Sequence, residues 1–158
     1  MTAVMLAERR FTLGDVSKAI ATSQKTLETR IRQDQLDFLA PKPHKWLRLS
    51  RQEVGAVACH DCLSQVIGAS VASAVMHKIV RRRQWALALE RAERAEDPST
   101  CDVVIVVSFD QQRKSLFVNM CSRANQDELL MLMTSGTATA VGIRVGPSIC
   151  GALQRLPV

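Results

Sequence analysis

The stretch from Thr22 to Leu36 predicts the second helix of a helix-turn-helix, and its side chains could read DNA. Leu27 and Ile31 are four residues apart, so in a helix they share one face and must point into a core. The other face is polar near its start and basic near its end, and it consists of Gln24, Lys25, Glu28, Thr29 and Arg32. In a helix that lies in the major groove, the N-terminal residues contact base edges and the far end contacts phosphate. An ordinary amphipathic surface helix is the alternative interpretation.

A second candidate for chemistry is the pair Cys59 and Cys62, because two thiolates three residues apart can bind one metal ion. The surrounding pattern predicts a helix, however, and no second pair of ligands stands at a suitable distance. The three histidines, His44, His60 and His77, are isolated in sequence. We therefore expect two buried helical cysteines, and neither a metal nor a redox site.

Patterns that indicate catalysis are missing from the sequence. The segment 134–139 lacks the lysine and most of the glycines of a phosphate-binding loop. There is no serine, histidine and aspartate arrangement, no pair of carboxylates in one segment, and no cofactor fingerprint. We expect a protein that is not an enzyme and that needs no cofactor.

Composition and charge suggest a globular protein that meets a polyanion at one end. The 158 residues, 47% of them apolar, allow one domain or two small ones. Residues 1–50 hold nine basic and five acidic side chains, a net charge of +4, whereas residues 99–158 hold five and four, a net charge of +1. This distribution is typical of a chain whose N-terminal end binds nucleic acid. Five cysteines, no secretory signal and no apolar run of about 18 residues predict a reduced, cytoplasmic protein without a membrane segment.

The residues before Ser23 predict the first half of a helix-turn-helix. Thr12 followed by Asp15 is close to a capping box, and it would begin a helix with a buried stripe. Ala21 and Thr22 would form the tight turn. Ser23 is then the expected N-cap of the second helix, because its hydroxyl can accept from a free N–H group of the first turn.

The residues after the second helix predict a basic loop and a third helix. Pro41 and Pro43 exclude a helix, and the loop carries Lys42, His44, Lys45 and Arg48. A basic loop closed by Trp46 is typical of a DNA-contacting wing, and a solvated loop with Trp46 in the core is the alternative. Ser50 and Glu53 form a full capping box that begins the third helix.

Taken together, residues 11–58 resemble the N-terminal winged helix-turn-helix of MerR-type regulators and the related excisionase-like domains. The resemblance is carried by Phe-Thr-Leu-Gly-Asp-Val at 11–16, by Ser-Gln-Lys-Thr-Leu at 23–27, and by Trp-Leu-Arg-Leu-Ser-Arg-Gln-Glu-Val at 46–54. It implies a DNA-binding role for Lys25, Thr29, Arg30 and the wing. The chain departs from the family pattern at the turn, where Ala21 replaces the usual glycine, and at Thr29-Arg30, which replaces an aromatic pair.

The remaining residues predict a helical linker and a small mixed domain. Residues 59–98 have a helical period, with a break or kink expected at Gly68 and an end at Asp97-Pro98-Ser99. The run from Cys101 to Phe109 predicts a central strand buried on both faces, and a second strand with Leu116, Val118 and Met120 and a third at 137–145 follow. Short helices are expected at 125–133 and, after a turn at Gly146-Pro147 and with Ser148 as the cap, at 148–156. We therefore predict an α+β protein with a winged helix-turn-helix at 1–60, a helical linker or dimerisation region at 61–98, and a dimerisation or sensor domain with a three-stranded sheet at 99–158.

These features predict a sequence-specific, double-stranded DNA-binding transcriptional regulator. One short helix and one wing rarely give sufficient affinity, so we expect a homodimer on paired half-sites, with any small-molecule effector unknown. We also expect residues 1–98 to fold without residues 99–158. Two alternatives remain open, namely an excisionase-like architectural factor that bends DNA, and an adaptor whose helix-turn-helix binds protein.

Overall fold

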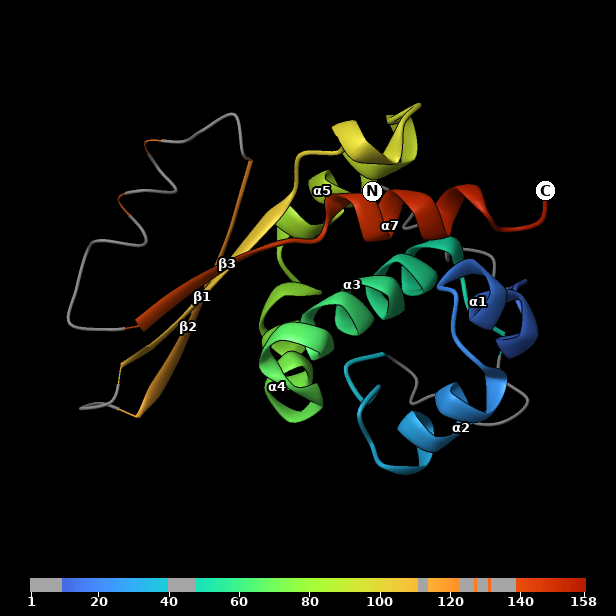
Figure 1. Cartoon of the computed structure of the whole chain (residues 1–158), viewed down its shortest axis with the longest axis horizontal. Coiled ribbons are helices and arrows are strands. Elements are labelled where there is room, and N and C mark those ends of the chain that lie inside the picture. The colour runs from blue at the N-terminus through green and yellow to red at the C-terminus, as the bar shows by residue number, and fades with distance from the viewer. Residues whose placement is uncertain (1–9, 40–47, 111–113, 123–126, 128–130, 132–138) are drawn as a thin grey trace, which may run out of the picture.

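A computed structural model describes residues 10–39, 48–110, 114–122, 127, 131 and 139–158 of the chain. Within these residues the chain forms six α-helices, one 3-10 helix and one three-stranded antiparallel sheet, which confirms a mixed α+β fold (Figure 1). In chain order the elements are α1 (Leu13–Ala19), α2 (Gln24–Arg32), α3 (Arg51–Ile67), α4 (Ala69–Ile79), α5 (Arg83–Arg94), η1 (Pro98–Thr100), β1 (Val104–Asp110), β2 (Ser115–Cys121), β3 (Thr139–Arg144) and α7 (Gly146–Gln154).

The first three helices begin where the sequence predicts caps. Thr12 and Asp15 form a capping box at α1, and the Ser23 hydroxyl accepts from the Thr26 N–H at the start of α2. Ser50 and Glu53 form the second capping box, at the start of α3. Each cap satisfies backbone N–H groups that the first helical turn leaves without a partner. These three predictions are confirmed.

Gly68 separates α3 from α4, as the sequence predicts. Its φ of +80° lies in the left-handed half of the backbone map, which a residue without a Cβ enters at little cost. The Gly68 N–H still donates to the Ser64 carbonyl at 3.1 Å, and its own carbonyl accepts from the Ala72 N–H at 3.0 Å. One helical run therefore becomes two helices that pack against each other.

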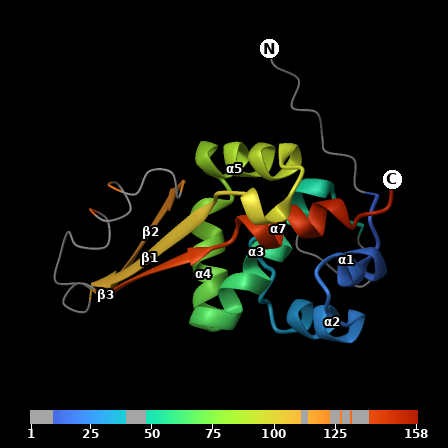
Figure 2. The ribbon, with the colours of Figure 1, turned by 45° about the horizontal axis from the view of Figure 1, so that its top comes forward.

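The C-terminal helix completes the core of the helical part. Figure 2 shows α7 between α3 and α5, and α7 also contacts α1. Ile149 and Leu153 are almost completely buried there, and Gly55 of α3 lets the helices approach closely, because a Cβ at that position would lie 2.6 Å from Leu89 Cδ2. One cluster of buried side chains extends from Phe11 to Leu156. The domain boundary predicted at residue 60 lies inside α3. Residues from the first and the last third of the chain both belong to this cluster.

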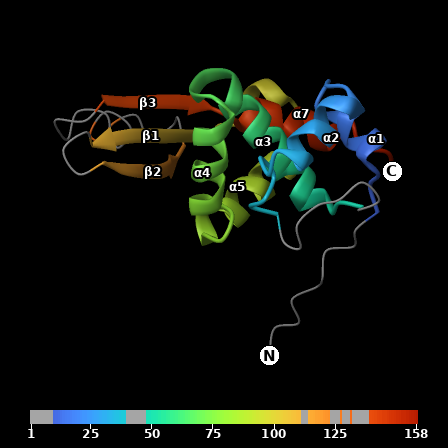
Figure 3. The same ribbon diagram turned by 90° about the horizontal axis from the view of Figure 1, so that it is seen from below.

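The sheet extends away from the helices in the order β2-β1-β3, with α4 beside its inner end (Figure 3). Val104 to Val107 are all buried, so the first half of the central strand is covered on both faces as predicted, whereas Phe109 in the second half is 45% exposed, contrary to the prediction. Val107 pairs with Val118 on one side and with Val141 on the other. Paired residues of antiparallel strands lie on one face, and at the inner end this face joins the helical core through Ile105, Met120 and Ile143.

Two predicted boundaries near the C-terminal end differ from the structure. The final helix begins at Gly146 with Val145 as its N-cap, so Ser148 is not the cap and Gly146-Pro147 is not a turn before the helix. The physical reason is that proline fits the first helical turn, where its missing N–H has no partner to lose. The central strand begins at Val104 and not at the predicted Cys101. Residues 98–100 form η1, and residues 101–103 connect it to the strand. The helix predicted at 125–133 falls almost entirely outside the described residues.

None of the helices among the described residues is both long enough and apolar enough to cross a lipid bilayer.

Candidate nucleic-acid interface

The connection between α1 and α2 has the geometry of a tight turn. Ala21 has a φ of +55°, and its N–H donates to the Lys18 carbonyl at 3.2 Å. The Thr22 N–H donates to the Ser17 carbonyl at 2.9 Å. A left-handed alanine costs about 1–2 kcal/mol, which explains why glycine is favoured at such a position. Ala21 therefore adopts a conformation that favours glycine.

Buried apolar residues fix the orientation of α2. Leu27 is fully buried in the core, and Ile31 is half-buried against it. This arrangement confirms the predicted inner face, but the helix ends at Arg32 and not at the predicted Leu36. The outer face carries the exposed side chains of Ser23, Gln24, Lys25 and Arg32, together with the half-buried Glu28 and Thr29. Figure 1 shows α2 at the end of the molecule that is remote from the sheet.

Local hydrogen bonds connect most of the outer side chains of α2. The Gln24 amide donates to Glu28 at 3.1 Å, the Thr29 hydroxyl donates to the Lys25 carbonyl at 2.9 Å, and Arg32 donates to Thr29 Oγ1 at 3.3 Å. The Lys25 side chain has no hydrogen bond or ion pair among the described residues. Exposed bonds of this kind contribute little stability, so a ligand with matching groups can replace them. The face can therefore offer donors and acceptors to a polar partner.

Arg30 does not belong to this outer face. Its Nη2 lies 2.6 Å from Asp61 Oδ1 of α3, and both side chains are 17% exposed. The other terminal nitrogen, Nη1, is buried without a hydrogen-bond partner in the described part of the chain. The pair thus holds α2 against α3. Arg30 is therefore not on the face that carries Lys25 and Thr29, although the resemblance implies a DNA-binding role for all three.

The predicted wing is described only at its end. Lys42, His44, Lys45 and Trp46 lie outside the described residues. Arg48 is exposed, and the neighbouring Leu49 forms an antiparallel bridge with Phe11, with N–H to carbonyl distances of 2.8 and 3.0 Å. This bridge joins the residues before α1 to those before α3, so the two ends of the segment that contains α1 and α2 lie together.

Charges near the start of α1 are also ordered. The hydroxyl and the backbone N–H of Thr12 donate to the Asp15 carboxylate at 2.7 and 2.8 Å, and these bonds lower the pKa of Asp15. The positive charges of Lys18 and Arg48 act in the same direction. Asp15 therefore stays ionised and completes the cap of α1 at neutral pH.

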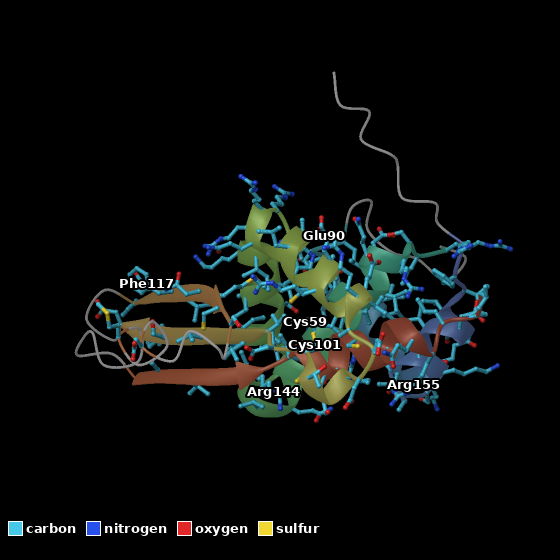
Figure 4. The ribbon with its side chains drawn as sticks, turned by 90° about the horizontal axis from the view of Figure 1, so that it is seen from above. Cys59, Glu90, Cys101, Phe117, Arg144 and Arg155 are labelled. Carbon is cyan, nitrogen blue, oxygen red and sulfur yellow. The ribbon has the colours of Figure 1, made fainter. Side chains whose placement is uncertain are left out.

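The cysteine pair in α3 lies away from this surface. Cys59 is fully buried, and burial raises the pKa of its thiol well above the ordinary value (Figure 4). Cys62 is half-buried, with its Sγ 3.7 Å from the Arg144 carbonyl. A thiol that resists ionisation is a poor metal ligand. Among the residues that the structure describes, no group of three or more histidine, cysteine or acidic side chains could hold a metal ion.

His60 has a structural role that its isolation in the sequence did not reveal. It is fully buried, its Nε2 lies 3.1 Å from the Ser73 hydroxyl of α4, and that hydroxyl donates to the Gln35 carbonyl at 2.7 Å. Burial, and secondarily the charge of Arg30, lower the pKa of His60 to about 4. The neutral ring therefore connects α3 and α4 to the segment that follows α2. The only sequence signal for the burial of His60 is that apolar residues, Val57 and Leu63, lie one helical turn away on either side.

No protein-family model matches the chain, and a search of curated proteins finds no match either.

Proposed function

We propose that the protein is a sequence-specific, double-stranded DNA-binding transcriptional regulator. The observation that carries the proposal is the pair α1 and α2, joined by a tight turn with a left-handed residue and oriented by the buried Leu27. In this arrangement the second helix presents Gln24, Lys25 and Thr29 outward from its first two turns. Side chains at these positions of a recognition helix can reach base edges in the major groove.

The far end of α2 and the start of the wing add positive charge to the proposed interface. Arg32 and Arg48 are exposed, and neither forms a salt bridge within the described residues. We assign both to contacts with phosphate, which position a protein on the duplex without reading its sequence. Arg30 is left out of the interface because Asp61 already neutralises it.

A homodimer completes the proposal. A single recognition helix gives limited affinity, and two copies on paired half-sites raise it. The outer end of the sheet supports this assembly, because Phe109 and Val141 are 45% and 36% exposed and lie on the same face of neighbouring strands. Apolar side chains that are grouped on a surface mark contacts with other proteins.

Selection of bound fragments from a random duplex library tests the proposed function. The purified full chain should enrich one motif, and for a twofold dimer the motif should be an inverted repeat. Enrichment without any shared motif would indicate binding to the DNA backbone alone. Failure to retain any duplex at low salt would exclude the proposed function, because electrostatic binding is strongest there.

A further inference from the structure

A basic groove lies between the edge strand β2 and the junction of α4 and α5. It has a volume of about 590 Å³, and we call it the β2 groove. Its lining consists of Lys78, Arg82, Lys114, Ser115, Leu116, Phe117, Val118 and Asn119. Figure 1 shows β2 on the side of the molecule remote from α2. The proposed DNA interface therefore makes no use of it.

The residues that line the β2 groove carry only positive charge. Lys78, Arg82 and Lys114 line it, and no acidic side chain does. Within the described part of the chain none of the three forms a salt bridge, and Arg81 and Arg83 add two more exposed cations beside it. Several like charges around a hollow raise the local positive potential and attract a negatively charged ligand.

The β2 groove follows the edge of the sheet. The consecutive residues 114–119 line it, and successive side chains of a strand point to opposite faces, so the groove must run along the edge between the two faces. Arg82 Nη1 donates to the Val118 carbonyl at 2.8 Å. That carbonyl therefore points away from β1, and backbone groups on this side accept donors that come from the groove. β2 is an edge strand among the described residues.

An exposed aromatic side chain adds an apolar contact. Phe117 is 48% exposed, although it lies in the middle of a strand. Figure 4 shows it on the outer part of the sheet, remote from Cys59 and Cys101 in the interior. Cations, an aromatic ring and a strand that has no further neighbouring strand among the described residues together suit a peptide. A peptide supplies carboxylates, apolar side chains and backbone N–H groups at once.

We propose that the β2 groove binds an acidic segment of a partner protein in an extended conformation. The segment adds a short strand beside residues 114–117, its carboxylates pair with Lys78 and Lys114, and an apolar side chain packs on Phe117. The Val118 carbonyl already accepts a hydrogen bond from Arg82, so it is not free to pair with the added strand. The added strand therefore ends before Val118 and spans only a few residues. The phosphate backbone of a nucleic acid fits less well, because phosphates accept hydrogen bonds and cannot donate to the outward carbonyls. The proposal is independent of DNA binding by α2.

Fluorescence anisotropy with labelled peptides and the full-length protein tests the proposal. The probe is a six-residue peptide of alternating valine and glutamate, compared with the same peptide carrying lysine in place of glutamate. A third peptide keeps the glutamates but has every backbone nitrogen methylated, so that neither of its edges can donate to a strand. The acidic peptide should bind, the lysine peptide should not, and methylation should weaken binding by about tenfold or more, the effect of losing one or two hydrogen bonds.

Charge-reversed variants locate the binding. The double variant Lys78→Glu/Lys114→Glu should lower the affinity for the acidic peptide by at least about tenfold, since attraction becomes repulsion. The variant Lys18→Glu/Lys25→Glu makes the same change in net charge at the other end of the molecule and should leave peptide binding unchanged. Circular dichroism spectra that match the unaltered protein would show that both variants are folded.

Four results would overturn the proposal. They are no binding of the acidic peptide at millimolar concentration, equal binding of the lysine or methylated peptide, unchanged affinity in a folded groove variant, and equal weakening in the Lys18→Glu/Lys25→Glu control. A groove variant that loses more affinity for random-sequence duplex than for the acidic peptide would also overturn it, in favour of a DNA contact. Because the readout is peptide binding, failure of DNA binding by α2 would be seen separately, in the fragment selection.

Discussion

The end of the molecule that contains α1 and α2 and the end that contains the sheet expose different chemistry. The outer face of α2 is polar, and its exposed side chains are mostly bonded to neighbours one turn away. The sheet end exposes Phe109 and Phe117 and leaves Lys78 and Lys114 without ion pairs among the described residues. A polyanion with donors and acceptors suits the first surface, and protein suits the second. The shared core of α3 and α7 fixes the two surfaces relative to each other, so each can be tested while the other serves as its control.

Removing the sheet end should have the largest effect, because it also removes α7. Ile149 and Leu153 of α7 are almost completely buried, and burial of each such side chain contributes about 1.5–3 kcal/mol. Together they account for a large part of the roughly 5–15 kcal/mol that stabilises a typical domain. We therefore expect the fragment 1–98 not to unfold cooperatively, which reverses the expectation from the sequence. A sigmoidal thermal transition of the fragment, followed by circular dichroism, would show that α1 to α5 fold without support from α7.

Acid should destabilise the protein through His60, which connects α3 and α4 to the segment after α2. The pKa of His60 is about 4 in the folded protein and about 6.5 in the unfolded chain, so the unfolded chain binds more protons between these values. The stability due to His60 is complete above pH 6.5 and decreases as the pH falls toward 4, by at most about 3 kcal/mol. Urea unfolding of His60→Gln should show a flatter pH profile than the unaltered protein. His77→Gln, at an exposed histidine, is the matched control, and a His60→Gln profile as steep as that of the unaltered protein would contradict this account.

A smaller effect should distinguish the two arginines at the end of α2. Asp61→Asn leaves the partly buried Arg30 without its counter-charge, and we expect a loss of about 1–3 kcal/mol in the free energy of unfolding. The double variant Arg30→Met/Asp61→Leu should recover most of that loss. Arg32→Ala should change stability by less than about 0.5 kcal/mol, because its side chain is exposed. Chemical denaturation measures all three, and equal stability of Asp61→Asn and Arg32→Ala would mean that the Arg30–Asp61 pair has no structural role.

Local patterns predicted the parts of the fold that depend on neighbours in sequence. Thr12 with Asp15, Ser50 with Glu53, and Gly68 each act within one helical turn, so their positions alone indicate where helices begin and end. The unbroken valine and isoleucine run likewise marked the central strand, because burial on both faces excludes polar side chains. The inner face of α2 followed in the same way from the spacing of its apolar residues.

Contacts between distant segments were not predictable from such patterns. Periodicity places Arg30 at the border between the two faces of α2, and only the position of Asp61 in α3 decides which face it joins. The apolar residues of α7 indicate that the helix has a buried side, but not that α3 and α5 cover it. The sequence predicts a turn at Pro147, because proline is common both after the end of a helix and in the first turn of one. Which of the two applies depends here on the strand that precedes Pro147.

The central claim, that α2 reads DNA, is tested most directly on the duplex obtained by fragment selection. Equilibrium binding should be measured for Lys25→Ala and Thr29→Ala, with Lys18→Ala of α1 as the control, against the selected duplex and a scrambled one. The account predicts that at least one of the two α2 variants loses about 1–3 kcal/mol of discrimination between the duplexes, while the control keeps it. Full affinity and full selectivity in both α2 variants would show that this helix does not read the DNA sequence.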